Sequence, residues 1–282
     1  MKNIIVMSGD IGSGKSSVAT ALQQLTGFDI IGTGAIQRAI ATRRGLTTLE
    51  LNKISQTDRS VDDEIDSYVV ETGKTQDRLI LDSRLAWHFI PTAFKVYLSV
   101  DAYVGAVRVF NAARDDEHNP SLEATLENNL KRQAIEDQRF QKLYQVNFRH
   151  YGNYDLIIDT SYTSPMVIAE KIKACFDAWL QHQTFAQLWI APKKLLPTRL
   201  IDPQEEVPAE PQTVSVVVHH GFVYIWQGHR RTYAAHKAGI ALLPATLAAE
   251  SGAVEQAQAV GRELLSAWEA LLGFKYDSYP KG

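Results

Sequence analysis

The segment of the sequence best suited to chemistry is the octapeptide GDIGSGKS at residues 9–16. It matches the pattern G-x-x-x-x-G-K-[ST], whose glycines let backbone N–H groups wrap phosphates while the lysine reaches the β- and γ-phosphate oxygens. An apolar run at residues 4–7 precedes it and a helical pattern at residues 17–22 follows, which is the context such a loop requires. The sequence therefore predicts ATP and Mg²⁺ as cofactors, held by Gly9, Gly12, Ser13, Gly14, Lys15, Ser16 and Ser17, with the Ser16 hydroxyl on the metal.

Asp82 is a second candidate for the chemistry, because it ends the apolar run at residues 79–81. A carboxylate at the end of a strand can hold Mg²⁺ through water or accept a proton from an attacking hydroxyl. We therefore predict Asp82 as a catalytic residue and as a metal residue beside Ser16. The structural alternative is an N-cap for the helix that follows Ser83.

Asp10 lies inside the loop itself, where an acid would repel a triphosphate unless it faces the acceptor. The sequence leaves two roles open for it: a base at the acceptor site, or a solvated turn residue. Because of the first role we include Asp10 among the catalytic candidates.

Strands and helices are expected to alternate through the first part of the chain, which predicts an α/β fold with a parallel sheet and helices on both faces. The expected strands are residues 3–8, 28–31, 78–81, 94–100 and 154–159, and the expected helices are residues 34–44, 48–56, 61–72, 102–114 and 120–144.

The pattern changes after residue 182, so we predict two domains, residues 1–182 and a smaller α+β domain at residues 183–282. Residues 188–190 and 195–196 look like buried structure, and the proline-rich stretch 200–212 is expected to be a loop inside the second domain. The further expectations are a hairpin of strands 214–218 and 222–226, a helix 232–238 ending at Gly239, a strand 242–247 and a closing helix 254–272.

The composition is that of an ordinary globular protein, with 45% apolar and 22% charged residues. No apolar stretch reaches the roughly 18 residues of a membrane helix, and the sequence runs from Met1 directly into a core strand, without a visible secretory signal. The single cysteine, Cys175, is expected in the core, which suits a reducing compartment. We therefore expect a cytoplasmic protein (in the host cytoplasm if it is phage-encoded) without a membrane partner; the oligomeric state does not follow from the sequence.

Residues 1–180 resemble the cytidylate-kinase-like branch of the P-loop nucleotide kinases. The resemblance rests on TGAIQR at 33–38, GLTTLE at 45–50, VDDEID at 61–66, LDSRLA at 81–86 and YDLIIDTS at 154–161. In that family the matching segments contact the acceptor nucleotide or form its walls, and a lid supplies arginines to the phosphates. The resemblance implies a phosphotransferase with a nucleotide acceptor, whose chemistry depends on positioning and charge neutralisation.

Four arginines match such roles. Arg38 and Arg84 stand at the family's acceptor-side positions, where a guanidinium can grip phosphate or base through two hydrogen bonds. Their structural alternatives are a solvated helix surface for Arg38 and an ion pair for Arg84. Arg132 and Arg139 are seven residues apart on the helix expected at 120–144, and so share one face, as a closing lid requires. The alternative for both is an idle surface position. The predicted catalytic residues are thus Lys15, Asp82, Arg84, Arg132, Arg139 and Asp10.

The second domain resembles the ParB/sulfiredoxin-like fold, through residues 223–239 and 243–245. Across that superfamily a Gly-x-x-Arg turn binds nucleotide phosphates at a helix N-terminus. The resemblance predicts a phosphate or DNA site at Gly228, His229, Arg230 and Arg231; the alternative is a turn that only caps a helix and makes salt bridges. The reductase branch of the superfamily needs a cysteine in this motif, and none is present.

Three functions remain. A kinase core joined to a ParB-like domain resembles phage enzymes that phosphorylate the hydroxymethyl group of 5-hydroxymethyluracil in DNA during thymine hypermodification, and this function ranks narrowly first. It requires a flipped or unpaired base and a base catalyst such as Asp82 or Asp10. It also requires one basic face on a chain of net charge −3, made by Lys193, Lys194, Arg199, Arg230, Arg231 and Lys237. The alternatives are a kinase for free CMP or dCMP, which leaves residues 181–282 unexplained, and a non-catalytic nucleotide-sensing module that binds DNA.

Overall fold

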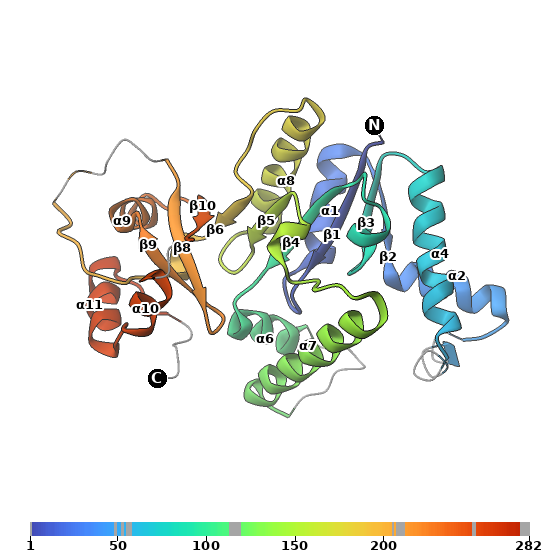
Figure 1. The fold of residues 1–282 in the computed structure, drawn as a ribbon, viewed down its shortest axis with the longest axis horizontal. Coiled ribbons are helices and arrows are strands. Elements are labelled where there is room, and N and C mark those ends of the chain that lie inside the picture. Colours follow the sequence, from blue (N-terminus) through green and yellow to red (C-terminus); the bar gives the residue numbers. More distant parts are fainter. Residues whose placement is uncertain are drawn as a thin grey trace.

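The computed structural model describes residues 2–47, 50–51, 54, 58–112, 120–204, 206, 212–249 and 252–276. These residues form one ten-stranded sheet with the strand order β2-β3-β1-β4-β5-β6-β10-β8-β9-β7 (Figure 1). Its strands are β1 (Ile4–Gly9), β2 (Asp29–Gly32), β3 (Leu79–Asp82), β4 (Phe94–Ser99), β5 (Leu156–Asp159), β6 (Leu188–Ile190), β7 (Leu195–Leu196), β8 (Val214–His219), β9 (Phe222–Gln227) and β10 (Leu243–Leu247).

The helices cover both faces of this sheet. They are α1 (Lys15–Thr26), α2 (Thr33–Arg44), α4 (Ser60–Thr75), α5 (Ala86–Phe89), α6 (Ala102–Asn111), α7 (Leu122–Tyr144), α8 (Pro165–Leu180), α9 (His229–Lys237), α10 (Gly252–Gln258) and α11 (Arg262–Leu272), with short 3₁₀ turns η1 (Tyr151–Asn153) and η2 (Pro192–Lys194). Among the described residues, none of these helices has both the length and the apolar character needed to cross a bilayer.

The first half of the sheet is parallel, as predicted, because β1 pairs in parallel with β3 and β4, and β4 with β5. Side chains of β1 alternate between two cores. Ile5 and Met7 pack with α1 and α8, in the core that also contains Cys175, whereas Ile4 and Val6 pack on the opposite face. The strands that follow β1 in the chain lie on its two sides, so the carboxyl end of β1 is a topological switch point, where ligands bind in sheets of this kind.

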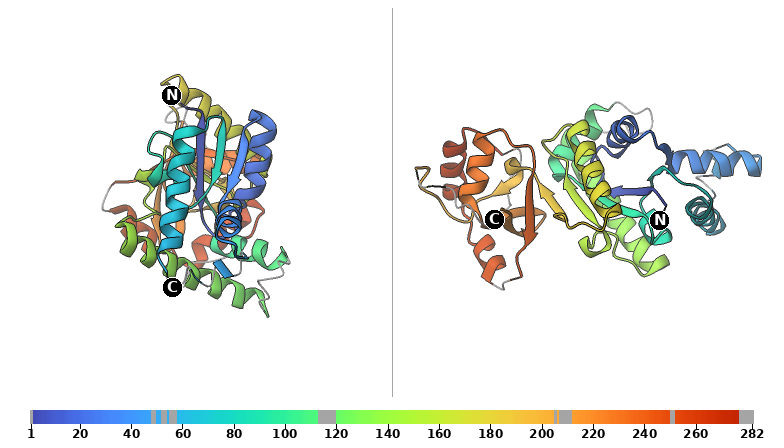
Figure 2. Two further views of the ribbon diagram at one scale, coloured as in Figure 1. Left: turned by 90° about the vertical axis from the view of Figure 1, so that its right-hand side faces the viewer. Right: turned by 90° about the horizontal axis from the view of Figure 1, so that it is seen from above.

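The sheet continues through the predicted domain boundary. Strand β6 pairs in parallel with β5, through Ile157 and Leu188, and antiparallel with β10, through Ile190 and Leu243. The C-terminal elements therefore extend the same sheet, at the end of the molecule opposite to α2 and α4 (Figures 1 and 2). Both the division at residue 182 and the ParB/sulfiredoxin-like assignment stay predictions.

Within the C-terminal half the predicted hairpin is confirmed. Strands β8 and β9 pair antiparallel around a turn at His220 and Gly221, both of which have positive φ. The predicted closing helix 254–272 is wrong, because it is two helices, α10 and α11, separated at Gly261, whose backbone is extended. Only residues 50, 51 and 54 of the helix predicted at 48–56 are described, and residues 113–114 of the helix predicted at 102–114 lie outside the described residues.

Candidate active site

A cleft of about 1290 Å³ opens at the carboxyl ends of β1 and β3. Its walls come from the loop at residues 11–14 and from α1, α2, α4, α6 and α7. The fold thus brings into one cavity most of the residues predicted for the chemistry: Gly12, Ser13, Gly14, Lys15, Ser16, Ser17, Arg38, Asp82, Arg84, Arg132 and Arg139.

The loop after β1 has the shape of a phosphate cradle. Gly14 is the N-cap of α1 with φ 77°, and a Cβ built there meets nothing within 4 Å, so the backbone conformation, and not crowding, demands glycine. The first N–H groups of α1 have no intrahelical partner, and the helix dipole adds partial positive charge at this end. The Ser13 hydroxyl is buried without a hydrogen-bond partner. An orphaned donor beside an open, electropositive helix end fits a bound triphosphate.

Lys15 and Asp82 face each other across this cradle. Burial lowers the pKa of Lys15 below its usual value, while the negative charge of Asp82 opposes that shift. The Ser16 hydroxyl donates to Asp82 Oδ2 at 3.3 Å. A hydroxyl and a carboxylate oxygen side by side are hard oxygen ligands of the kind Mg²⁺ takes, with phosphate oxygens and waters completing its shell. The two predicted metal residues are therefore adjacent, and they fit the ion.

The arginines of the cleft are gathered around acidic side chains. Glu136 of α7 forms ion pairs with Arg84 and with Arg132, the latter at 3.2 Å, and Arg139 lies 2.5 Å from Asp62 Oδ2. Burial lowers the pKa of Arg84 to about 10, with the neighbouring positive charges of Arg132 and Arg149 adding to the shift. The alternative of an ion pair for Arg84 is thus realised inside the cleft itself, where a phosphate can replace the carboxylate as its partner.

Arg38 differs from the other three arginines. It is exposed on α2, as its structural alternative expected, and it lines the same cleft. The cleft therefore has a basic group on α2 as well as on the helix predicted to be its lid, and the acceptor role of Arg38 stays a prediction.

Asp10 is held by groups in and next to β4 and by Arg149. Its carboxylate accepts hydrogen bonds from Tyr97 Oη at 2.6 Å and from Val100 N at 3.0 Å, and it forms an ion pair with Arg149. It does not line the cleft. Asp10 is therefore not a solvated turn residue; it anchors the loop to β4, and its role as a base at the acceptor stays a prediction.

Gly9 also has a role other than the predicted contact with the cofactor. It lies outside the cleft, and a Cβ at this position lies 2.3 Å from Leu98 O. Glycine is needed there because the chain passes directly against β4.

Two residues that line the cleft were not predicted from the sequence. Arg108 of α6 donates to Thr160 O at 2.7 Å, to Ser161 O at 3.1 Å and to Gly12 O at 3.3 Å, and so braces the phosphate loop. Its signal was a lone basic residue on an otherwise apolar helix. Asp66 lies in the cleft wall, where burial raises its pKa to about 6 although Tyr144 Oη donates to it at 2.8 Å. It belongs to the VDDEID segment, which did mark this wall.

In the turn predicted as a second phosphate site, one of the four residues, His229, is buried. Gly228 has φ 100° at the N-cap of α9, but His229 is only 1% exposed and its Nε2 accepts from Thr198 N at 3.1 Å. Burial lowers the pKa of His229 to about 3. His229 is therefore a core residue rather than a ligand for an external phosphate. Arg230 and Arg231 are half-buried and contact Glu206 O and Gln212 Oε1, and their role in binding stays a prediction, as does that of Gly228.

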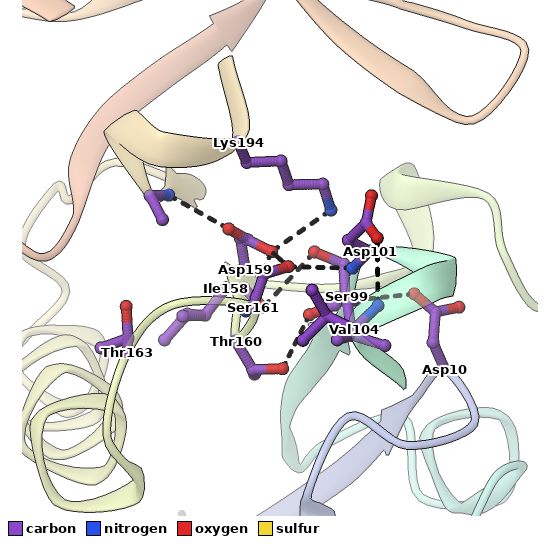
Figure 3. A network of polar contacts seen from close by, with 12 residues as sticks. Asp10, Ser99, Asp101, Val104, Ile158, Asp159, Thr160, Ser161, Thr163 and Lys194 are labelled. Carbon is purple, nitrogen blue, oxygen red and sulfur yellow. Dashed lines mark hydrogen bonds and ion pairs between the residues drawn. The ribbon is translucent and has the colours of Figure 1, made fainter. Parts of the chain in front are cut away.

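The basic face required for the DNA-base function is incomplete. The Lys194 side chain is 10% exposed and its Nζ lies 3.2 Å from Asp159 Oδ1, so its charge is directed inward (Figure 3). Lys237 donates to Leu272 O at 3.2 Å. Lys194 therefore does not contribute to the exposed basic face that the DNA-base function requires.

Comparison with known proteins shows which family this chain resembles. A family model described as an AAA domain matches residues 5–136. The cytidylate kinase of Methanococcoides burtonii is 29% identical over 175 residues, 62% of this chain and 97% of the relative, and that of Natronomonas pharaonis is 32% identical over 178 residues, 62% and 90% respectively.

The chain is also similar to two proteins that are not named as cytidylate kinases. An S-adenosylmethionine-dependent nucleotide dehydratase of Lacinutrix mariniflava is 34% identical over 173 residues, 61% of this chain but 35% of that protein. A crystal structure of an uncharacterized protein from Eubacterium ventriosum shares the fold, with a TM-score of 0.50 at 13% identity over 63% of this chain and 99% of the other. Since nine tenths of the Natronomonas enzyme aligns at 32% identity, the chain belongs to the cytidylate-kinase family of P-loop kinases, and it is a kinase that uses ATP and Mg²⁺.

Proposed function

We propose that this kinase transfers the γ-phosphoryl group of ATP to the phosphate of a free pyrimidine nucleoside monophosphate, CMP or dCMP. The observation that carries the proposal is the set of arginines facing the cleft beyond the phosphate loop: Arg38, Arg84, Arg132 and Arg139. Guanidinium groups bind phosphate through paired hydrogen bonds, and an acceptor phosphate competes with Glu136 and Asp62 for them.

The reaction needs little from the protein besides position and charge. An oxygen of the acceptor phosphate attacks the γ-phosphorus, the bond from that phosphorus to the β–γ bridging oxygen breaks, and ADP leaves. A nucleoside monophosphate is largely dianionic at neutral pH, so this nucleophile requires no base. Bound Mg²⁺ neutralises the charge that develops on the β- and γ-phosphate oxygens. Lys15 adds positive charge there, and Arg84 and Arg132 hold the acceptor phosphate near it.

The far wall of the cleft suits a pyrimidine base. Ile65, Phe140 and Tyr144 provide apolar and aromatic surface, and the Asp66 carboxyl lies beside them. Flat apolar surface with one convergent polar group is the usual composition of a site for a small heterocycle.

The DNA-base function, ranked first from the sequence, has less support than the free-nucleotide function. A hydroxymethyl acceptor is a neutral alcohol and needs a base, and the Asp10 carboxylate is held by Arg149 and Tyr97. Of the two base candidates, Asp82 is the one that lines the cleft. With Lys194 directed inward as well, phosphorylation of 5-hydroxymethyluracil in DNA stays a prediction and is one outcome of the test.

The test is transfer of label from γ-labelled ATP by the full chain to CMP, dCMP and UMP and, in separate reactions, to DNA containing 5-hydroxymethyluracil. Label in CMP or dCMP supports the proposal. Label that enters only the DNA overturns it in favour of the base kinase. Tight binding of ATP with no transfer to any acceptor favours the nucleotide sensor. Lys15→Ala supplies the background in every reaction.

A further inference from the structure

A buried ion pair joins the C-terminal part of the chain to the kinase core. Lys194 ends η2, and its Nζ lies 3.2 Å from Oδ1 of Asp159, the last residue of β5. The side chains of Lys194 and Asp159 are 10% and 1% exposed. Asp159 Oδ2 also accepts from Ala191 N at 3.2 Å, so two groups of the C-terminal part converge on one core carboxylate (Figure 3).

Hydrogen bonds continue from Asp159 to the helix behind the phosphate loop. Ser161 Oγ donates to Asp159 Oδ1 at 2.6 Å and accepts from Asp101 N at 2.8 Å. The Asp101 carboxylate in turn caps α6, accepting from Tyr103 N at 2.9 Å and from Val104 N at 3.1 Å. The position of α6 thus depends on Ser161, which Asp159 holds.

Helix α6 in turn supports the loop that binds the triphosphate. Arg108 of α6 donates both to Ser161 O and to Gly12 O. The backbones of Gly12 and Gly105 also touch, because a Cβ at Gly12 lies 2.4 Å from Gly105 O. A small displacement of α6 therefore moves the loop, since no side chain separates the two backbones.

The charge balance shows why Lys194 matters to this path. The pKa of the Lys194 ammonium lies above its usual value. Burial alone lowers this pKa, but the surrounding negative groups, led by Asp159, outweigh the effect of burial. Removal of one partner from a buried ion pair leaves an uncompensated charge, which takes up a proton or draws in water. Either change alters the hydrogen bonds that Asp159 makes to Ser161.

We propose that Lys194 is a positioning residue for ATP binding, so that the segment at residues 192–194 completes the nucleotide site of the kinase. It acts through Asp159, Ser161 and α6 on the backbone of Gly12. This role is independent of the acceptor, and it applies equally to a free nucleotide and to a DNA base.

The test is the dissociation constant of MgATP, measured by calorimetry without acceptor on the full chain, at a temperature where each variant is folded. We expect Lys194→Met to weaken MgATP binding about tenfold, ~1.4 kcal/mol. The double variant Lys194→Met with Asp159→Asn is expected to recover part of this loss, because the amide oxygen keeps the bond to Ser161 without a buried charge, while the amide NH2 group cannot accept from Ala191 N. Lys193→Met is the control, since Lys193 is exposed and its ammonium lies over the Phe274 ring at 5.4 Å.

A purely structural Lys194 lowers the melting temperature but leaves the MgATP dissociation constant unchanged in the folded protein, and that result overturns the proposal. The proposal is also overturned if the double variant binds MgATP as weakly as Lys194→Met. If Lys194→Met does not fold, Lys194→Arg replaces it. Arginine keeps the charge but moves its donors, so we expect weaker MgATP binding, and parental binding counts against the proposal. Binding is read without acceptor, so failure of the CMP assay leaves this result intact.

Discussion

The hydroxyl of Ser16 lies 3.3 Å from Oδ2 of Asp82, although the two residues are 66 positions apart in the chain. The parallel pairing of β1 and β3, with Met7 opposite Asp82, places the ends of the two strands side by side. The helix that begins immediately after the phosphate loop then turns Ser16 toward the carboxylate. The two residues that the sequence predicted as metal ligands are thus adjacent in the fold.

Asp82→Asn is expected to lower turnover at least about tenfold and to raise the Mg²⁺ concentration needed for half-maximal activity, because the amide cannot offer a charged oxygen to the ion. Activity is measured across a Mg²⁺ titration at saturating ATP. An unchanged Mg²⁺ dependence assigns Asp82 to a structural role. Asp155→Asn is the matched control, because Asp155 lies outside the cleft and precedes β5.

Lys15→Ala is expected to abolish phosphoryl transfer, since it removes the positive charge nearest the β- and γ-phosphates. The measurement is initial rate with labelled ATP and the best acceptor. Activity within about tenfold of the parent, a loss of only ~1.4 kcal/mol of transition-state stabilisation, contradicts this role. Lys131→Ala is the control, because Lys131 is an exposed residue of α7 paired with Glu127.

Arg149→Met is expected to destabilise the fold by about 3 kcal/mol, because it leaves the half-buried Asp10 carboxylate without its ion-pair partner. Arg149 also contacts Asp137 of α7 at 3.0 Å, so the change removes a second ion pair, which links the loop to α7. Urea unfolding measures the effect, and the double variant with Asp10→Asn is expected to recover part of the loss. Equal destabilisation by the single and double variants rules out the ion pair as the cause.

His229 predicts a specific dependence of stability on pH. Burial lowers its pKa to about 3 in the folded protein, against an ordinary value of 6.5. The unfolded chain therefore binds the extra proton first, and stability present above pH 6.5 is lost as the pH falls toward about 3, with a slope of ~1.4 kcal/mol per pH unit. The difference in unfolding free energy between the parent and His229→Gln, measured from pH 7.5 to 4.5, isolates this effect. A difference that stays constant with pH shows that His229 does not titrate as described.

The sequence revealed those parts of the site whose chemistry is local. The loop followed from a short pattern, and so did the ends of β1, β3 and β4, each within one residue of the structure, whereas the helical pattern at residues 17–22 marked only the middle of α1. Asp10 could not be assigned in this way, because its partner Arg149 lies 139 positions away. The same holds for Lys194, which looked like one of several surface cations until the fold placed it beside Asp159.

The sequence marked residues 188–190 and 195–196 as buried structure but not as strands, because β6 and β7 are three and two residues long, too short for alternation to be visible. The error at the closing helix has a physical cause as well. The apolar pattern of α10 continues into α11 across Gly261, so the break depends on the extended backbone of one glycine.

The sharing of β6 between β5 and β10 has a consequence for biosynthesis. As the chain leaves the ribosome, the outer edge of β5 stays unpaired until Leu188–Ile190 emerges, and β6 itself lacks its second neighbour until Leu243–Leu247 has been made. Long-range closure of this kind is slow, and an uncovered edge invites pairing with another nascent chain. Pairing with β10 therefore closes the edge of β6 that is otherwise open to another chain.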